Sequence, residues 1–204
     1  MSPGNLQPLS VFDFDGTLIH GDSLWSFFAL AAGWPQVALA SAETVAAFTV
    51  QHFLHQDDRA VVDRKTFFKQ QMLQRLIAGK RVEDFKQPIA ALRDSLRWNE
   101  TLRQTLQEHY DQGHHIVISS GALDLYLPEL VKDLPHHALL CTTIEVDGGL
   151  ATAVMPDGNC VRQGKAARVT NYIASHGPFG ESWGFGNFPD DVPMLNLVRH
   201  RIIV

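Results

Sequence analysis

The sequence has little of what marks secreted, membrane-spanning or nucleic-acid-binding proteins. Its 204 residues include two cysteines, Cys141 and Cys160, which are too few for a disulfide framework and form no CxxC zinc motif. The net charge of −5 and the pI near 6.0 argue against a nucleic-acid partner. Residues 1–10 contain neither a basic segment nor an apolar run, so we expect no secretory signal and a cytoplasmic location.

A long uninterrupted hydrophobic run is also missing. Residues 24–54 are rich in Ala, Phe, Leu and Val, but Gly33-Trp34-Pro35 breaks the run and Glu43 lies within it, so it does not read as a membrane span. Such a stretch is still compatible with a protein that contacts one surface of a membrane. The remaining composition, 45% hydrophobic and 19% charged, is that of a globular chain with one domain or a domain and a subdomain.

What the sequence does contain is an acidic pair in an apolar strand, within VFDFDGT at residues 11–17. Asp13 and Asp15 lie two residues apart, so on a strand they point to the same side. Buried carboxylates need a partner or a metal. Two of them at a strand end form a hard oxygen site suited to Mg²⁺, and they also supply a nucleophile beside a proton donor.

Simpler interpretations of this stretch exist. An EF-hand loop that starts at Asp13 would need glycine at its sixth position, which is Leu18, and it would follow a helix. The Asp15-Gly16 pair could also be a plain turn signal. The downstream sequence decides between these interpretations.

The pattern along the chain predicts an α/β fold with a helical insertion. Helices are expected over residues 22–32, 35–55, from Asp57-Asp58 to Gly79, and over 82–97, 100–111, 123–133 (kinked at Pro128), 165–175 and 191–198. Strands are expected over 9–15, 115–119, 183–186 and 202–204, with a strand–turn–strand over 139–154 around Asp147-Gly148-Gly149. Alternating strands and helices imply a parallel sheet. The expected core is therefore residues 1–19 and 101–204, and the helical insertion is residues 20–100.

Polar residues follow the predicted strands at the edge where parallel sheets bind ligands. Asp13 and Asp15 end the first strand, and Ser119-Ser120-Gly121 end the second. Asn187, Asp190 and Asp191 follow residues 183–186, and Gly164-Lys165 precede a helix. Together these groups match a site that holds a phosphate on one side and a carboxylate-bound metal on the other.

These residues resemble the four motifs of the haloacid dehalogenase superfamily of phosphatases, in the family order. The motifs are Asp13-Phe14-Asp15-Gly16-Thr17 for DxDGT, Ser119 after HIVIS, Lys165, and residues 186–191 (GNFPDD) for GDxxxD. The segments DGTLIHGDS, IEVDGG, NCVRQGK and VPML look like the phosphoserine-phosphatase-like branch, subfamily IB. The resemblance covers nearly the whole chain, and it implies a Rossmann-like parallel sheet with an inserted α-helical C1 cap.

The resemblance also implies a mechanism. Asp13 is the expected nucleophile, which forms an aspartyl-phosphate, and Asp15 is the expected general acid and base. Mg²⁺ is the implied cofactor, held by Asp13, the Asp15 carbonyl, Asn187 and Asp191. The implied phosphate-binding groups are Ser119, Lys165, Thr17 and the N–H groups near Ser120 and Gly121.

Each of these residues has a structural alternative. Ser119 could merely end a strand, Thr17 could cap a turn, Lys165 could be a solvated helix residue, and Asp191 could be a helix N-cap. We expect Asp190 to be exposed or to lie outside the first layer of the site. The pairs His114-His115 and His136-His137 suggest a metal site, but neighbours on a strand point to opposite faces, which disfavours it.

The predicted function is Mg²⁺-dependent hydrolysis of a small phosphomonoester through an aspartyl-phosphate. The departure from the family pattern is Asn187, which offers a carbonyl oxygen but no charge where the family has an acid, so we expect weaker metal binding. One alternative is a phosphatidylglycerophosphate-like phosphatase at a membrane surface, suggested by Trp25, Phe27, Phe28 and Trp34. Another is a non-catalytic phospholigand-binding module. Arg64, Lys65 and Lys69 are candidate substrate contacts in the insertion.

Overall fold

The computed structural model describes residues 6–54 and 63–204. The chain divides into two compact units. Unit 1 consists of Met1–Ser23, Arg93–Thr143 and Asp157–Val204, and unit 2 consists of Leu24–Leu92 and Ile144–Pro156. All of the site residues predicted from the motifs belong to unit 1.

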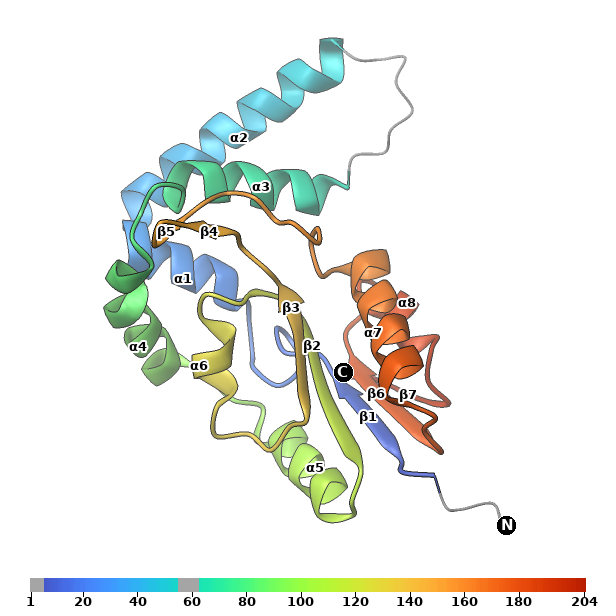
Figure 1. The fold of residues 1–204 in the computed structure, drawn as a ribbon. Helices are drawn as coiled ribbons and strands as arrows, with labels where there is room; N and C mark the ends of the chain where they lie inside the picture. Colours follow the sequence, from blue (N-terminus) through green and yellow to red (C-terminus); the bar gives the residue numbers. More distant parts are fainter. Residues whose placement is uncertain (1–5, 55–62) are drawn as a thin grey trace. The chain divides into compact units, whose positions relative to one another are not determined.

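Unit 1 is built on a five-stranded sheet in the order β3-β2-β1-β6-β7 (Figure 1). Every pair of neighbouring strands in it is parallel. The strands are β1 (Leu9–Phe12), β2 (His115–Leu123), β3 (Ala138–Thr142), β6 (Ser182–Gly186) and β7 (His200–Ile203). The predicted α/β class with a parallel sheet is therefore confirmed, and β1 is its central strand.

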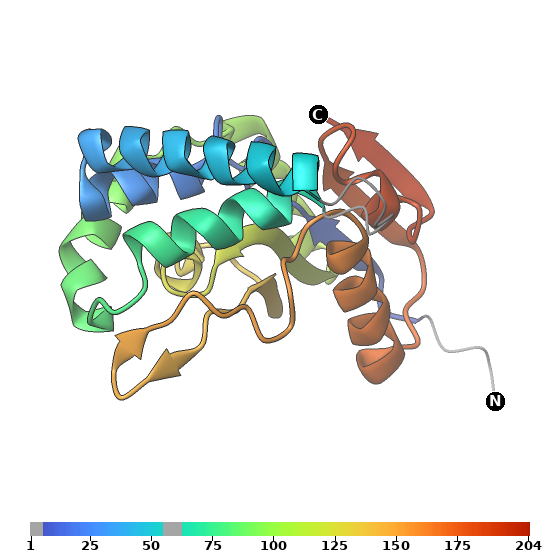
Figure 2. The same ribbon diagram turned by 90° about the horizontal axis from the view of Figure 1, so that it is seen from above.

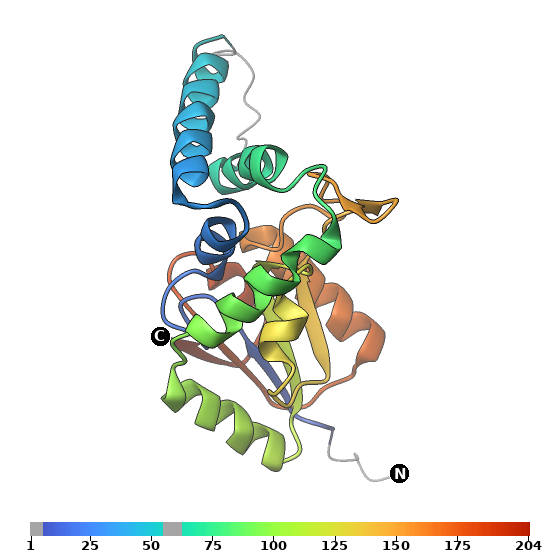
Figure 3. The same cartoon turned by 90° about the vertical axis from the view of Figure 1, so that its left-hand side faces the viewer.

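Helices cover both faces of the sheet (Figure 3). α5 (Glu100–Asp111) packs on one face, and α7 (Arg162–His176) with α8 (Val192–Leu195) packs on the other. Leu9 and Val11 belong to the buried cluster that also contains Val169 of α7 and Leu195 of α8. Because strand side chains alternate, the next residue on that face is Asp13. The hydrophobic pattern of β1 thus directs the first acid toward α7.

The helix predicted over residues 123–133 is shorter than expected. β2 continues through Leu123, whose strand partner is Thr142, and α6 covers only Leu127–Val131. Pro128 lies in the first turn of α6 and does not kink a longer helix. Proline suits that position because the first helical N–H groups have no partner within the helix.

Unit 2 contains the predicted helical insertion (Figure 2). Its helices are α1 (Ser23–Ala32, from the last residue of unit 1), α2 (Trp34–Leu54), α3 (Arg64–Leu76), the 3₁₀ helix η1 (Val82–Phe85) and α4 (Lys86–Ser95, which ends in unit 1). The single helix predicted over 82–97 is thus divided between η1 and α4. Asp63 caps α3 through its side chain, whereas the predicted start at Asp57-Asp58 and the positions Val61 and Val62 lie outside the described residues.

The predicted hairpin at Asp147-Gly148-Gly149 groups with unit 2. β4 (Val146–Asp147) pairs with β5 (Leu150–Ala151), and the Gly79 N–H donates to the Ala151 carbonyl at 2.9 Å. Unit 2 therefore differs from the predicted interval 20–100, since it begins at Leu24, ends at Leu92 and includes residues 144–156. The predicted interval did not include residues 144–156, because their backbone partners in unit 2 lie far away in the sequence.

The apolar stretch of residues 24–54 is divided between core and surface. Phe27 and Phe28 are fully buried, whereas Trp34 is 65% and Leu39 62% exposed. Trp25 is 36% exposed and packs against Phe68. Within residues 6–54 and 63–204, no helix has the length and hydropathy needed to cross a membrane.

The paired histidines at the start of β2 point to opposite faces, as expected. His114 Nδ1 lies 2.9 Å from Ser10 Oγ and 2.9 Å from His109 Nδ1, on the α5 face. His115 Nε2 lies 2.7 Å from the Tyr172 hydroxyl of α7. Ser10 Oγ is also 2.7 Å from His109 Nδ1, so Ser10, His109 and His114 form a closed polar cluster. This cluster lies at the start of β1, at the end of the sheet opposite to the acids.

The polar cluster makes stability depend on pH. Burial, and then the neighbouring His114, lowers the pKa of His109 from 6.5 to about 4. Because the unfolded chain binds this proton more readily, we expect the contribution of His109 to stability to be lost as the pH drops from about 6.5 toward 4. Melting temperatures of the wild type and of His109→Asn, measured between about pH 7.5 and pH 4.5, should converge as the pH falls. Two parallel curves would contradict the assignment.

Candidate active site

The first acid follows β1 directly and keeps its sheet geometry. The Asp13 N–H donates to the Phe185 carbonyl of β6 at 2.9 Å. The chain then turns, since the Thr17 N–H donates to the Phe14 carbonyl at 3.2 Å and Gly16 has a φ of +76°. A Cβ on Gly16 would lie 2.9 Å from Asn187 Nδ2, so both the conformation and the space require glycine.

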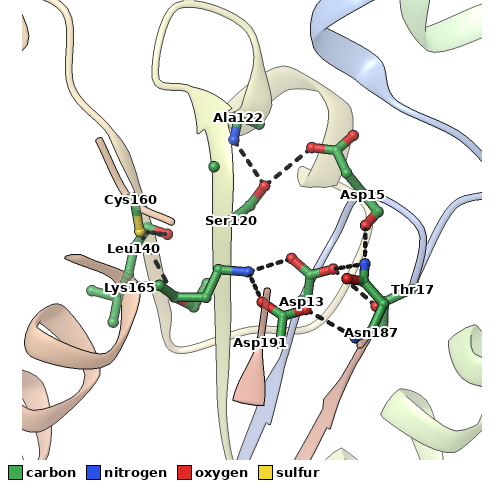
Figure 4. A network of polar contacts seen from close by, with 12 residues as sticks. Asp13, Asp15, Thr17, Ser120, Ala122, Leu140, Cys160, Lys165, Asn187 and Asp191 are labelled. Carbon is green, nitrogen blue, oxygen red and sulfur yellow. Dashed lines mark hydrogen bonds and ion pairs between the residues drawn. The ribbon is translucent and has the colours of Figure 1, made fainter. Parts of the chain in front are cut away.

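An ion triad of Lys165, Asp13 and Asp191 occupies the carboxyl end of the sheet (Figure 4). Lys165 Nζ of α7 donates to Asp13 Oδ1 at 2.6 Å and to Asp191 Oδ1 at 2.5 Å. All three side chains are at most 4% exposed. The predicted lysine is therefore buried between two predicted acids and is not a solvated helix residue.

The charges of this ion triad depend on one another. Burial and the neighbouring Asp191 raise the pKa of Asp13 to about 6, although Lys165 lowers it. Burial lowers the pKa of the Lys165 ammonium, but Asp13 and Asp191 outweigh that effect and raise the pKa above its usual value. We conclude that Lys165 stays charged and holds the carboxylates beside it.

The second oxygen of Asp13 is also held in place. Thr17 Oγ1 donates to Asp13 Oδ2 at 2.9 Å, and Asn187 Nδ2 lies 3.5 Å from the same atom. The Thr17 hydroxyl thus orients the carboxylate of Asp13, while its predicted contact with a phosphate stays a prediction. With both oxygens held, Asp13 has a fixed orientation at the end of its strand.

Asp15 has a different environment from Asp13. Its Oδ1 accepts the Ser23 N–H at 2.7 Å, and its Oδ2 accepts the Ser120 hydroxyl at 3.3 Å. We expected both acids on one side of a strand, but β1 ends at Phe12 and the turn after Phe14 takes Asp15 out of the strand geometry. Burial, and then the charge of Asp22, raises the pKa of Asp15 to about 7.

Two residues that support Asp15 were missed from the sequence. Ser23, expected only as a helix cap, binds Asp15 through its backbone N–H, and its hydroxyl lies 3.1 Å from the Tyr126 hydroxyl. Tyr126 is fully buried. The Asp22-Ser23 pair marked the start of a helix, but nothing in the local pattern linked it to an acid eight residues earlier. The contact depends on the turn between them.

The side chains of the two serines in the predicted motif point in different directions. Ser119 is buried, and its Oγ lies 3.9 Å from Cys160 Sγ. Ser120, assigned to phosphate binding, instead directs its hydroxyl to Asp15 and accepts the Ala122 N–H at 2.9 Å. The Gly121 carbonyl accepts the Thr142 hydroxyl at 2.9 Å. Phosphate binding by Ser119 and by the Ser120 and Gly121 N–H groups stays a prediction.

The last motif brings Asp191 back toward the sheet. Asp191 precedes α8, but its side chain makes no capping bond, and its Oδ2 accepts the Asn187 N–H at 2.9 Å. A Cβ on Gly186 would lie 2.7 Å from the Asp191 Cβ, so glycine permits this approach. Asp190 pairs with Arg162 at 2.8 Å and takes no part in the ion triad. This contact agrees with the prediction that Asp190 does not belong to the residues that bind the metal or the phosphate.

The oxygen atoms around Asp13 fit a hard cation in part. The Asp13 and Asp191 carboxylates and the Asp15 carbonyl are ligands of the type that Mg²⁺ takes. Asn187 directs Nδ2, not its oxygen, at the Asp15 carbonyl, at 2.9 Å. In the described part of the chain, no group of three His, Cys, Asp or Glu side chains is placed to hold a metal. Any cation site here therefore depends on the amide and the backbone carbonyl.

This arrangement suits covalent group transfer. Asp13 is a fixed carboxylate with an ammonium at its side, which favours a nucleophile that is ionised near neutral pH. Asp15 is a separate carboxyl group with a pKa of about 7, which favours a group that both gives and takes a proton. Two acids in different environments can thus perform different steps.

Removing the ammonium should destabilise the fold strongly. In Lys165→Met, two buried carboxylates lose their counter-charge, so we expect the free energy of unfolding to fall by about 3–5 kcal/mol near neutral pH. Urea denaturation measures this, and the loss should shrink at low pH as the carboxylates are protonated. Lys132→Met is the matched control, because Lys132 pairs with Glu129 on the surface, where solvent screens the ion pair, and its loss should be far smaller. Equal losses in both variants would contradict a buried ion triad.

Comparisons with known proteins agree on the fold. Residues 10–196 match the haloacid dehalogenase-like hydrolase family. A protein of unknown function from Bordetella pertussis Tohama I has a TM-score of 0.73 at 18% identity, over 97% of this chain and 90% of that one. A substrate-bound phosphoserine phosphatase has a TM-score of 0.64 at 15% identity, over 97% and 85%. A phospho-aspartyl intermediate analogue of phosphoserine phosphatase has a TM-score of 0.64 at 15% identity, over 97% and 86%.

A search of curated protein sequences gives no match. The family match nevertheless spans almost the whole chain and includes the segments that carry Asp13, Ser119, Lys165 and Asp191. The superfamily expected from the motifs is therefore confirmed, and the chain belongs to the haloacid dehalogenase-like hydrolase family.

Proposed function

We propose that this protein is a Mg²⁺-dependent phosphomonoester hydrolase that acts on a small phosphorylated metabolite through an aspartyl-phosphate on Asp13. The observation that carries the proposal is the pairing of two differently held acids. Asp13 is fixed by Lys165 and Thr17, and Asp15 is held by the Ser23 N–H. A nucleophile and a separate proton donor are what two-step phosphate hydrolysis requires.

In the first step, a carboxylate oxygen of Asp13 attacks phosphorus, and the bond from phosphorus to the leaving oxygen breaks. Asp15 gives its proton to that oxygen, which departs as an alcohol. A pKa of about 7 leaves a large fraction of Asp15 protonated at neutral pH, so the proton is available. Lys165 keeps a positive charge beside Asp13 while the phosphoryl group approaches.

In the second step, Asp15 takes a proton from water, and the resulting hydroxide oxygen attacks the phosphorus of the aspartyl-phosphate. The bond from phosphorus to Asp13 breaks, and inorganic phosphate leaves with Asp15 protonated again. When bound, Mg²⁺ supplies positive charge to the phosphoryl oxygens. The groups that would hold it are Asp13, the Asp15 carbonyl, Asn187 and Asp191.

The similar structures support the covalent route. One is a substrate-bound phosphoserine phosphatase and another is an analogue of its phospho-aspartyl intermediate. Unit 2 is the segment we assign to the family's C1 cap, which selects the leaving group and excludes water. Arg64 and Lys65 of α3 are exposed and remain candidate substrate contacts, whereas Lys69 is buried.

A membrane-surface lipid phosphatase is the second candidate. Along α2, Trp34, Leu39, Val45 and Val50 are each more than half exposed. Apolar side chains on one helix suit contact with a lipid surface. The fully buried Phe27 and Phe28, which also suggested lipid binding, belong to the core and favour the soluble metabolite instead.

A substrate screen with Asp13→Asn tests the proposal. Phosphomonoesters are incubated with Mg²⁺, and phosphate release is measured, with phosphatidylglycerophosphate in vesicles as one of the substrates. We expect turnover of at least one small phosphomonoester, lost in Asp13→Asn because an amide is a poor nucleophile. Asp190→Asn is the matched control and should keep its activity, because Asp190 pairs with Arg162.

Three results of the screen would change the assignment. Hydrolysis of the vesicle substrate alone would favour the lipid phosphatase. Phosphate binding without turnover of any substrate would favour a non-catalytic binding module. Full activity in Asp13→Asn would exclude the covalent route.

The acid role of Asp15 makes a separate prediction about leaving groups. In Asp15→Asn, phosphate esters of simple alcohols should lose about 10²–10⁴-fold in rate, because the alkoxide leaves unprotonated. Esters of p-nitrophenol should lose much less in the first step, since that leaving group is stable without a proton. Pre-steady-state release of the alcohol measures this step. An equal loss for both esters would show that Asp15 is not the acid.

A further inference from the structure

The Asn187 side chain faces the site with the opposite end to the one its predicted role as a metal ligand requires, since Nδ2 and not Oδ1 points at the other ligands. Its Nδ2 donates to the Asp15 carbonyl at 2.9 Å and lies 3.5 Å from Asp13 Oδ2 (Figure 4). Both acceptor oxygens belong to the proposed Mg²⁺ ligand set. Because Nδ2 lies within 3.5 Å of both oxygens, a cation held by both would meet its positively polarised N–H groups. The amide hydrogen bonds and the cation therefore compete.

The competition follows from the structure of the asparagine carboxamide. Asparagine carries its donor and its acceptor on the same planar group, so only a turn of about 180° brings Oδ1 to the place of Nδ2. That turn gives up the hydrogen bond to the Asp15 carbonyl. Aspartate at the same position has no N–H group and would add a negative charge. With Asn187, the charges of Asp13, Asp191 and Lys165 sum to −1 (−2 + 1), and aspartate would make the sum −2.

The surroundings confine the movement to the amide itself. The Asn187 backbone N–H is held by Asp191 Oδ2 at 2.9 Å, and the Asp191 N–H returns to the Asn187 carbonyl at 3.1 Å. The missing Cβ of Gly16 leaves room for Nδ2, since a Cβ there would lie 2.9 Å away. The backbone is thus fixed, and only the end of the side chain is free to reorient.

We propose that Asn187 acts as an internal competitor of the metal: its amide donates to the ligand oxygens and must turn before a divalent cation binds. This inference rests on the proposed Mg²⁺-dependent function and concerns the control of the same site. Its consequence is weak, readily reversible metal binding, so that the concentration of free Mg²⁺ sets the fraction of active protein. An aspartate at this position would bind the metal firmly and lose the internal hydrogen bonds.

Asn187→Asp tests the proposal through two measurements that need no substrate. Isothermal titration with Mg²⁺ should show binding at least about tenfold tighter than in the wild type, because a charged ligand replaces a turning amide. In EDTA, the variant should melt below the wild type. Without a metal, its new carboxylate lies against Asp13 and the Asp15 carbonyl, and these groups repel one another. In saturating Mg²⁺ the difference should vanish or reverse.

Two further variants separate the parts of this effect. Asn99→Asp makes the same chemical change at the N-cap of α5, where the side chain accepts the Leu102 N–H, and it should alter neither Mg²⁺ affinity nor the response to EDTA. Asn187→Ala removes donor and acceptor together. It should lower the melting temperature in EDTA without tightening Mg²⁺ binding.

The direct readout is the side-chain NH₂ of Asn187. Its two ¹H–¹⁵N signals, identified by their loss in Asn187→Asp, should shift over the same Mg²⁺ concentrations as the binding curve. Unchanged signals at saturating Mg²⁺, or Asn187→Asp binding no tighter than the wild type, would overturn the proposal. If the wild type hydrolyses no phosphomonoester but Asn187→Asp still shows the tighter binding and the reversal, the proposed function fails and the competition stands.

Discussion

The buried ion triad of Asp13, Lys165 and Asp191 is the constraint on which the rest of unit 1 depends. One ammonium pairs with two carboxylates, which come from the end of β1 and from the start of α8. A buried charge without its partner is costly, so β1, α7 and α8 must meet whenever the chain folds. The contact with Lys165 that holds these segments together also fixes the Asp13 carboxylate.

The two acids of the first motif owe their different surroundings to the end of a strand. Asp13 keeps the alternation of Leu9 and Val11 and therefore faces α7 and its lysine. The turn at Gly16 redirects Asp15 toward the Ser23 N–H and the Ser120 hydroxyl. The turn from Phe14 to Thr17 thus separates the two environments.

The sequence predicted the parts of this site that depend on chain pattern. Asp13, Lys165 and Asp191 follow or precede elements that apolar periodicity marks, and parallel strands bring such ends together. The contacts of Ser23, Ser120 and the Asn187 amide could not be predicted, because each depends on a turn or on the rotation of one side chain. The hairpin at Asp147-Gly148-Gly149 was visible as a turn, but its partner near Gly79 was not, since backbone pairing leaves no residue-specific signal.

The cluster of Ser10, His109 and His114 at the opposite end of the sheet affects how the enzyme must be assayed. The acids respond to pH both through the proposed reaction and, as buried carboxylates, through folding, whereas this cluster responds through folding alone. Because only folded protein is active, a rate that declines in acid combines lost catalysis with lost native protein. A pH–rate profile is therefore interpretable only beside a profile of the folded fraction, and the variant His109→Asn, which leaves the acids untouched, separates the two.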